Sequence, residues 1–427
     1  MRRDFLKLCG LIGLGFACPG GVTTFLRGAT REEPPYEGPY YVVFNASGGW
    51  DTTYLMDPKG VGGINRLYQE GDILTQGRHK FAPNAKHVTA GMANEDFFKE
   101  FGADLLVLNG LDYSVNNHSP GARYMATGKL DSMAYPTFAA LVAAAKGPAC
   151  PISFLTFGNY SATGNIVAMS RIPYLPSLQR VANADHIEGN IRSPYHDDFA
   201  LARIEDALRE QREASAALPL LPRRERAQGM LYAAQVNSKA LQRVTRHIPA
   251  SIPKERLSQQ AEIALASFKA GVCVSANLSI GQFDSHANND VDQMKLIPEL
   301  LAGIAYLLRR AEALNIRDKI VVVVQSEMGR TPNYNQGNGK DHWSIGSAMF
   351  LGPGIRGNRV IGATDEKQFH IPLDPKSLAC DREHGIRVRP EHIHEALRQF
   401  AGIADHSFSK KFPLGVPDKE KLQALWS

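Results

Sequence analysis

Short, uninterrupted apolar runs constrain the fold of this chain more than any other feature. Helix-forming segments separate several of these runs, most clearly at 136–146, about 253–269 and about 291–314. Strands that are apolar on both faces and alternate with helices are typical of a mostly parallel sheet that is covered on both sides. The sequence therefore predicts an α/β fold. The runs that we expect to form its strands are 40–47, 104–111, 151–158, 272–280, 319–326 and 348–352.

Residues 1–30 are predicted to be an export signal and not part of the fold. The paired Arg2 and Arg3 precede a Phe-Leu-Lys sequence and an apolar run, residues 8–17, that is too short to span a bilayer comfortably. This pattern resembles a twin-arginine export signal, which a receptor reads. The alternative is an amphipathic N-terminus that stays in the cytosol. We expect the twin-arginine export machinery as a partner, a periplasmic or secreted location, and no stable membrane span in the mature chain.

The rest of the chain is predicted to form one large domain, residues 40–427, after a polar, proline-bearing linker at 31–39. Residues from about 198 to 270 are rich in Ala, Leu, Arg, Glu and Gln at helical spacing. We expect them to form a helical insertion that packs on the sheet. The net charge of +5 is small for this length and the basic residues are scattered, so we expect no nucleic-acid partner.

Acids, histidines and hydroxyls follow the predicted strands. In such a sheet, ligands bind beyond the carboxyl ends of the strands. The stretch GQFDSHANN, residues 281–289, leaves one strand and places Asp284 and His286 two residues apart. Taken alone, it is equally compatible with a turn that closes the strand and caps the next helix. The other candidate residues, at strand ends or in the glycine-rich loop before the last strand, are Asp51, His118, Ser119, Glu327, Arg330 and His342.

These residue types indicate a divalent metal site. Asp, Glu and His are the ligands of zinc and of other divalent first-row metals. Several carboxylates that converge on one sheet edge would repel one another without a cation. The sequence therefore predicts a metal at this edge, with one or two ions. Zinc is favoured, and calcium and manganese are the alternatives.

The candidate motifs together resemble a known family. The ordered set GGWD, NNHSPGARYMATGK, FDSHANN, SEMGRT and GKDHW resembles the domain-of-unknown-function 1501 proteins, over roughly residues 40–400. That family is similar to the alkaline phosphatase and sulfatase superfamily. The resemblance implies a doubly wound, alkaline-phosphatase-like α/β sheet with a one- or two-metal site. It also implies hydrolysis or transfer at phosphorus or sulfur.

Carried over position by position, the resemblance assigns five candidates to metal binding. Asp284 and His286 match an acid and a histidine that bind one metal, and His342 matches a late histidine ligand. A zinc ion held by these three residues keeps an open position. Asp51 matches the first-strand carboxylate ligand, and Glu327 matches the acid of a later turn. These two acids either hold a second cation or orient the histidines.

The chain departs from the superfamily pattern at the nucleophile. His118 stands in the nucleophile position, Ser119 follows one residue late, and Met328 stands where the superfamily places a histidine ligand. These departures leave the second metal and covalent catalysis open. His118 is suited to bind a metal or to transfer a proton. Ser119 is either a nucleophile or the N-cap of a helix that begins at Pro120. Arg330 either clamps a phosphate or sulfate oxygen or forms a surface ion pair.

Two functions are compatible with these features. The first is an exported, metal-dependent hydrolase of phosphate or sulfate esters, which acts on a small-molecule or saccharide ester. The second is a non-catalytic envelope binding protein that has the same fold and a degenerate metal site. His118 and Met328 are the residues that favour the second function.

Replacing Arg2 and Arg3 with lysine is expected to leave the precursor in the cytoplasm of a bacterial host, because the export receptor reads the paired arginines. Cell fractionation followed by immunoblotting measures the distribution. An undiminished amount of periplasmic protein in this variant would contradict the predicted export route.

Overall fold

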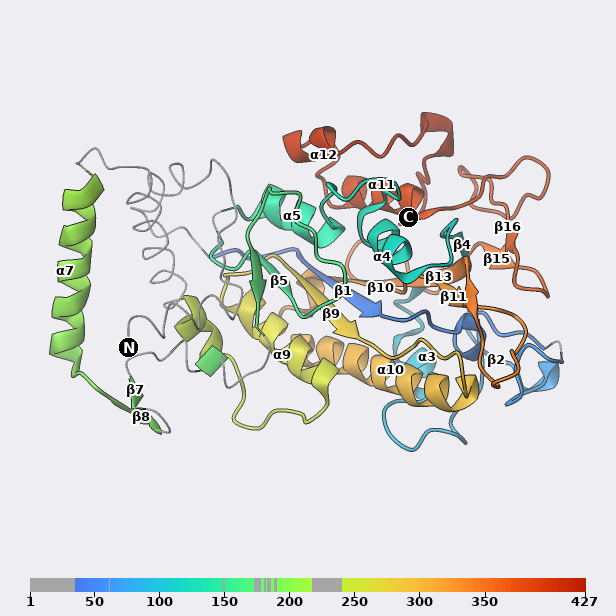
Figure 1. The fold of residues 1–427 in the computed structure, drawn as a ribbon, viewed down its shortest axis with the longest axis horizontal. Coiled ribbons are helices and arrows are strands. Elements are labelled where there is room, and N and C mark those ends of the chain that lie inside the picture. Colours follow the sequence, from blue (N-terminus) through green and yellow to red (C-terminus); the bar gives the residue numbers. More distant parts are fainter. Residues whose placement is uncertain are drawn as a thin grey trace.

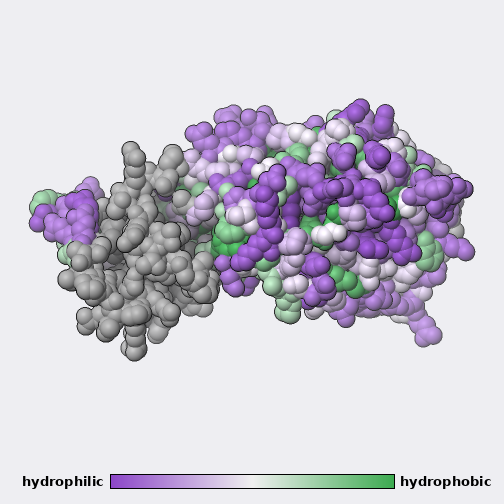
Figure 2. Space-filling view, turned by 90° about the horizontal axis from the view of Figure 1, so that it is seen from above, coloured by the Kyte–Doolittle hydropathy of each residue, from purple (hydrophilic) through white to green (hydrophobic). Residues whose placement is uncertain are grey.

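The computed structural model describes residues 35–427 except 61, 149, 173–177, 180–181, 183–185, 188–189 and 217–239. The predicted export signal and residues 31–34 of the predicted linker lie outside the described residues. Within the described part, no helix is both long and apolar enough to cross a bilayer. On the face shown in Figure 2, hydrophilic residues cover most of the described surface, and hydrophobic residues form small, separate areas.

A central eight-stranded sheet organises the fold, in the order β14-β4-β13-β10-β1-β9-β5-β6 (Figure 1). Its strands are β1 (Tyr40–Ala46), β4 (Leu106–Asp112), β5 (Phe154–Thr156), β6 (Met169–Arg171), β9 (Ser275–Ile280), β10 (Ile320–Gln325), β13 (Ile345–Leu351) and β14 (Arg359–Ile361). Neighbouring strands are parallel except at β13, which runs antiparallel to both β10 and β4. The predicted mostly parallel α/β sheet is confirmed.

Short hairpins and helices complete the described part of the chain. The remaining strands pair as β2 (Leu74–Gln76) with β3 (His79–Phe81), β7 (His186–Ile187) with β8 (Asn190–Pro194), β11 (Gly329–Arg330) with β12 (His342–Trp343), and β15 (Ala363–Thr364) with β16 (His370–Ile371). The α-helices are α3 (Asn94–Phe101), α4 (His118–Thr127), α5 (Phe138–Lys146), α7 (Asp198–Ala216), α9 (Arg256–Lys269), α10 (Asn289–Ala313), α11 (Pro390–Phe400) and α12 (Ser407–Lys411). Short 3-10 helices span Thr52–Tyr54, Glu70–Asp72, Arg317–Lys319 and Asp418–Glu420.

Helices cover both faces of the sheet, with α9 and α10 on one face and α5 and α11 on the other (Figure 1). Along β1, Tyr40, Val42 and Phe44 belong to the core that contains α9 and α10. Tyr41 and Val43 belong to the core that contains α5 and α11. Successive side chains of a strand point to opposite faces. A strand between two helical layers therefore has to be apolar at every position, and this explains the uninterrupted apolar runs.

The predicted helices are present, with boundaries set by local caps. The helix predicted at 136–146 begins at Phe138, because the side chain of Thr137 accepts a hydrogen bond from the amide of Ala140. α9 ends just before Gly271, which has a φ of +68° that suits glycine.

The antiparallel direction of β13 was not predicted. Residues 327–344, between β10 and β13, contain no helix, and a parallel return usually needs a helical crossover. The chain therefore turns back at the carboxyl edge of β10. As a result, the beginning of β13 lies at the same edge as the ends of the parallel strands. His342, which precedes β13, reaches this edge for that reason.

The predicted helical block at 198–270 contains α7 and α9. α9 packs against α10 and β9 with a fully buried face that includes Ala261, Leu265 and Phe268. Residues 217–239 of the block lie outside the described residues. The assignment of 198–270 as an insertion remains a prediction.

Gly48, in the turn after β1, fixes the approach of two strand ends. Its φ is +117°, and a Cβ atom at this position would lie 2.5 Å from the amide nitrogen of Asp284. The amide of Gly48 also donates a hydrogen bond to Glu327 Oε1 at 2.7 Å. A residue without a side chain is therefore required where the loops after β1, β9 and β10 meet.

Gly48→Ala is expected to lower the free energy of unfolding by about 1–3 kcal/mol, because alanine is strained at this φ and its methyl group displaces the backbone of Asp284. Denaturant unfolding measures the change. Gly281→Ala is the matched control, because Gly281 lies in the adjoining loop, has no positive φ, and has no atom within 4 Å of the place that an alanine Cβ would occupy. Equal stability of the two variants would contradict the role of Gly48.

Candidate metal centre

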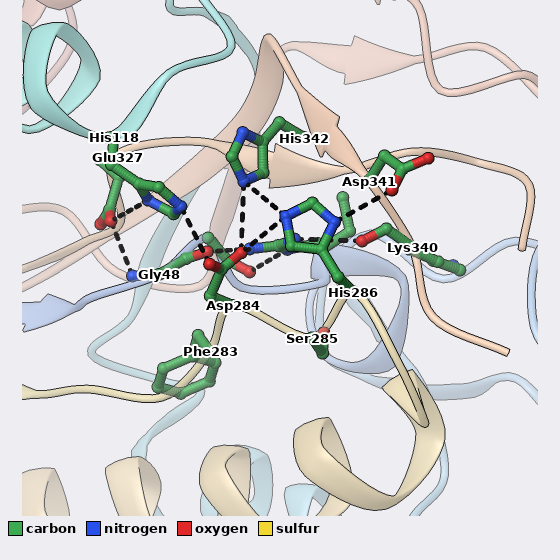
Figure 3. A network of polar contacts seen from close by, with 12 residues as sticks. Gly48, His118, Phe283, Asp284, Ser285, His286, Glu327, Lys340, Asp341 and His342 are labelled. Carbon is green, nitrogen blue, oxygen red and sulfur yellow. Dashed lines mark hydrogen bonds and ion pairs between the residues drawn. The ribbon is translucent and has the colours of Figure 1, made fainter. Parts of the chain in front are cut away.

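Four predicted residues meet at the carboxyl edge of the sheet (Figure 3). Asp284 and His286 follow β9, His118 is the first residue of α4, and His342 is the first residue of β12. In Figure 3 the three imidazole rings surround the carboxylate of Asp284. The exposed fractions of the side chains are 43% for Asp284, 37% for His118, 48% for His286 and 21% for His342. The group is therefore reachable from solvent.

Two histidines converge on one oxygen of Asp284. The Nε2 atoms of His286 and His342 lie 3.1 Å and 3.2 Å from Asp284 Oδ1, and 3.0 Å from each other. Tetrahedral ligands that bind zinc at about 2.0–2.1 Å lie about 3.3 Å apart. The three atoms are thus spaced almost as ligands of one ion.

His118 approaches the other oxygen of the same carboxylate. Its Nε2 atom lies 3.2 Å from Asp284 Oδ2, but the orientation is not that of a hydrogen bond, and this buried nitrogen has no hydrogen-bond partner among the described residues. Ligand atoms of His118, Asp284 and His342 all lie within 4.8 Å of one another. Buried polar atoms are rarely left without a partner. A cation bound here would supply one for His118, so these residues fit a metal ion.

Each of the three imidazole rings is also held in its orientation by a hydrogen bond at its second nitrogen. The Nδ1 atom of each ring has its own oxygen acceptor. The pairs are His118 with Glu327 Oε1 (3.1 Å), His286 with Asp341 Oδ1 (3.0 Å) and His342 with the carbonyl oxygen of Asn116 (2.8 Å). A metal-binding histidine typically donates its second N–H in this way, which turns the free nitrogen toward the metal. Glu327, predicted as a ligand or an orienting acid, orients His118.

Arg330 does not occupy a substrate-clamping position. Its side chain is fully buried, and its Nη2 donates to Asp284 Oδ1 at 2.8 Å. Its other hydrogen bonds go to the carbonyl oxygens of Gly48, Gly49 and Lys340. Partial burial favours the neutral carboxyl of Asp284, but the hydrogen bond and charge of Arg330 outweigh it and lower the pKa to about 2. Neither the predicted clamp nor the surface ion pair matches this placement.

Asp51 does not join the centre, because lysine already neutralises it. Both Asp51 and Lys340 are fully buried, and Lys340 Nζ lies 2.7 Å from Asp51 Oδ2. The same oxygen accepts a hydrogen bond from Asn289, and Oδ1 accepts two from Thr53. With both oxygens satisfied and its charge paired, Asp51 has no geometric support as a metal ligand.

Ser119 is neither the helix cap nor an activated hydroxyl here. α4 begins at His118, and the capping side chain is that of Asn117, which accepts from the amide of Ser119. Ser119 is exposed. Among the described residues, none hydrogen-bonds its hydroxyl, so no base stands ready to activate it. The predicted N-cap was wrong by two positions, because asparagine caps as well as serine.

The sequence reasoning did not assign roles to Asn116, Lys340 and Asp341. Asp341 orients His286, and Lys340 neutralises Asp51. The sequence does give a signal for Lys340 and Asp341, because both directly precede His342 in the GKDHW motif. The sequence gives no signal for the role of Asn116, since the acceptor is its backbone carbonyl oxygen and every residue has one.

Together the sheet and the cluster define an α/β protein with a candidate His₃Asp metal centre at the carboxyl edge. The family described as protein of unknown function (DUF1501) matches residues 42–394, and the chain belongs to this family. No curated protein matches the sequence.

Solved structures similar to the chain include hydrolases and a synthase. A lipoteichoic acid synthase from Listeria monocytogenes has a TM-score of 0.38 and 8% identity, with 90% of this chain and 78% of that chain covered. A sulfatase from Pseudoalteromonas sp. has a TM-score of 0.38 and 10% identity, with 97% and 74% covered. Alkaline phosphatase from the Antarctic bacterium TAB5 has a TM-score of 0.33 and 9% identity, with 76% and 94% covered. Because these scores are below 0.5, the fold assignment rests on the eight-stranded sheet and its helical layers.

His342→Ala is expected to lower the metal content of the purified protein and its melting temperature together, because metal binding is linked to folding. Elemental analysis and thermal unfolding measure the two quantities. His87→Ala removes an exposed histidine outside the cluster and is the control.

Asp51→Asn tests whether Asp51, as well as Asp284, contributes to metal binding. It breaks a buried ion pair, so the melting temperature falls, while about one ion per chain stays bound at Asp284. Full metal content in His342→Ala, or its loss in Asp51→Asn alone, would contradict the ligand set.

Proposed function

We propose that this protein is an exported, metal-dependent hydrolase of phosphate or sulfate esters. The observation that carries the proposal is the convergence of three oriented imidazoles and one carboxylate at a solvent-accessible sheet edge. The ester class follows from the resemblance of the sequence motifs to the phosphatase and sulfatase superfamily. Export follows from the twin-arginine pattern at residues 1–30.

The donor set supports zinc over the alternatives. Imidazole nitrogens suit zinc, whereas calcium takes oxygen ligands and manganese favours carboxylate, carbonyl and water. Asp284, His286 and His342 would hold the zinc ion, which would supply a Lewis acid for an ester oxygen and a better water nucleophile near neutral pH. The charge of Lys340 beside Asp51 supports one ion over two.

The side chains of the centre have different proposed roles, which follow from their positions. Asp284, His286 and His342 form the binding set, because the two Nε2 atoms meet at Asp284 Oδ1. His118 faces the second carboxylate oxygen, with its ring held by Glu327. From this position His118 either completes the ligand set or exchanges a proton with a bound ester at Nε2. Water is the attacking group in this arrangement, since Ser119 has no base.

A binding protein with the same fold is the second candidate. Two observations favour it: the hydroxyl of Ser119 is not activated, and Arg330 is buried and therefore cannot hold an anion. In that function the centre would bind a metal without turning over an ester.

The test is hydrolysis by the purified, exported chain of an aryl phosphate, a phosphodiester and an aryl sulfate, after chelation and return of zinc, manganese or calcium. Zinc is expected to restore the most activity. His118→Ala should lower kcat by about 10²–10⁴, the range for lost proton transfer. Ser119→Ala should stay within a few-fold of the parent protein.

Two results would overturn parts of this proposal. A phosphoseryl or sulfoseryl peptide trapped at residue 119, with activity lost in Ser119→Ala, would replace water with serine as the nucleophile. Absence of turnover on all three ester types, with metal bound, would favour the binding protein.

A further inference from the structure

A cavity of about 240 Å³ lies at the same edge of the sheet, beyond the strands on the far side of β9 from β1. Phe157, which follows β5, and Arg171, the last residue of β6, line it. Gln260 lines it too, and its amide pairs with both backbone groups of Ser279, near the end of β9. The cavity thus occupies the edge where α/β sheets bind ligands. None of the residues of the candidate metal centre lines it.

Two arginines without partners face this cavity. Arg171 and Arg256 come from different elements, and both are exposed residues at the rim of the cavity. Neither side chain makes a hydrogen bond or ion pair within the described part of the chain. None of the described residues that line the cavity is acidic. The planar N–H donors of a guanidinium group match the oxygens of sulfate, phosphate and carboxylate, so an oxyanion is the ligand that these side chains suit.

The start of α9 adds a third positive feature. Arg256 is the first residue of this 14-residue helix, the side chain of Glu255 caps no amide, and the first turn contains no acid. The uncapped N–H groups and the helix dipole favour an anion at this end. A cation at a helix N-terminus opposes stability. The placement of Arg256 therefore has no stabilising explanation within the helix itself.

Apart from the two arginines, the described lining residues are three apolar side chains and two glutamines, Gln259 and Gln260. Ile172 and Ile263 are buried and Phe157 is partly buried. Such a lining suits the carbon body of a ligand, with an aromatic ring available for stacking. The ligand class is therefore an oxyanion carried on an organic or saccharide body.

We propose that this cavity binds an oxyanion group, such as sulfate, phosphate or carboxylate, between Arg171 and Arg256. Adjacent strands lie about 4.8 Å apart, so the ends of β5 and β6 are roughly 10–15 Å from the end of β1 at the metal centre. An extended ligand spans that distance. If the proposed hydrolase function holds, the cavity retains an anionic group of the substrate that is not cleaved.

Calorimetric titration of the full, metal-loaded protein with sodium sulfate and with sodium phosphate tests the site, with ionic strength balanced by chloride. Saturable binding is expected in the parent protein. Arg171→Gln and Arg256→Gln should each weaken it about tenfold or more, the loss of one charge-assisted hydrogen bond. Arg382→Gln removes an exposed arginine outside the cavity and should bind as the parent does. His342→Ala disables the metal centre and should also retain binding.

Three outcomes would overturn the proposal: no saturable binding in the parent protein, unchanged affinity in both arginine variants, or loss of binding in His342→Ala, which would assign the anion to the metal centre.

A second experiment measures the hydrolysis of an ester. With an ester that bears a second anionic group, Arg171→Gln should raise KM and leave kcat unchanged. Retained anion binding without any hydrolysis would support the cavity and reject the hydrolase function.

Discussion

One buried guanidinium connects the loops on which the metal centre depends. Arg330 donates hydrogen bonds to carbonyl oxygens of Gly48 and Gly49 after β1, to that of Lys340 before β12, and to the carboxylate of Asp284 after β9. Arginine is always charged and offers its donors in a fixed plane. It therefore adds side-chain hydrogen bonds to three loops that are also joined by backbone hydrogen bonds, such as that from the amide of Phe283 to the carbonyl oxygen of Ser47. It also keeps Asp284 ionised, which a metal ligand requires.

Charge pairing at this edge explains why the sequence argument was only partly right about the metal. Converging carboxylates do need cations, but the protein supplies two of its own. Lys340 neutralises Asp51 in a fully buried pair, and the buried Arg330 pairs with the partly exposed Asp284. A sequence pattern shows which residue types reach an edge and not which of them pair. The ligand role of Asp51 and the clamp role of Arg330 were therefore beyond what spacing alone could decide.

The fold was more predictable than the site because burial on both faces leaves a strong local signature. β1, β4, β9, β10 and β13 were all visible as apolar runs. The three-residue strand β5 was visible too, because it lies within the longer run 151–158, whereas no apolar run of that length contains β6 or β14. The direction of β13 depends on the path of residues 327–344, which carry no periodic signal. His342 was nonetheless found at the edge, since its motif precedes a strand that starts there.

The two features at this edge have opposite electrostatic requirements. The candidate metal centre presents the carboxylate of Asp284 beside three imidazole nitrogens and suits a cation. The cavity beyond β9 presents Arg171 and Arg256, with no acid among its described lining residues, and suits an anion. With the proposed metal bound, Asp284 and the histidines would hold a cation that attracts an anionic ligand, which would make the first feature a second anion-binding position. An extended molecule with two anionic groups would then satisfy both positions at once, and a molecule with one group would satisfy only one. The charge pattern of the edge therefore favours a multiply charged ligand over a small monoanion.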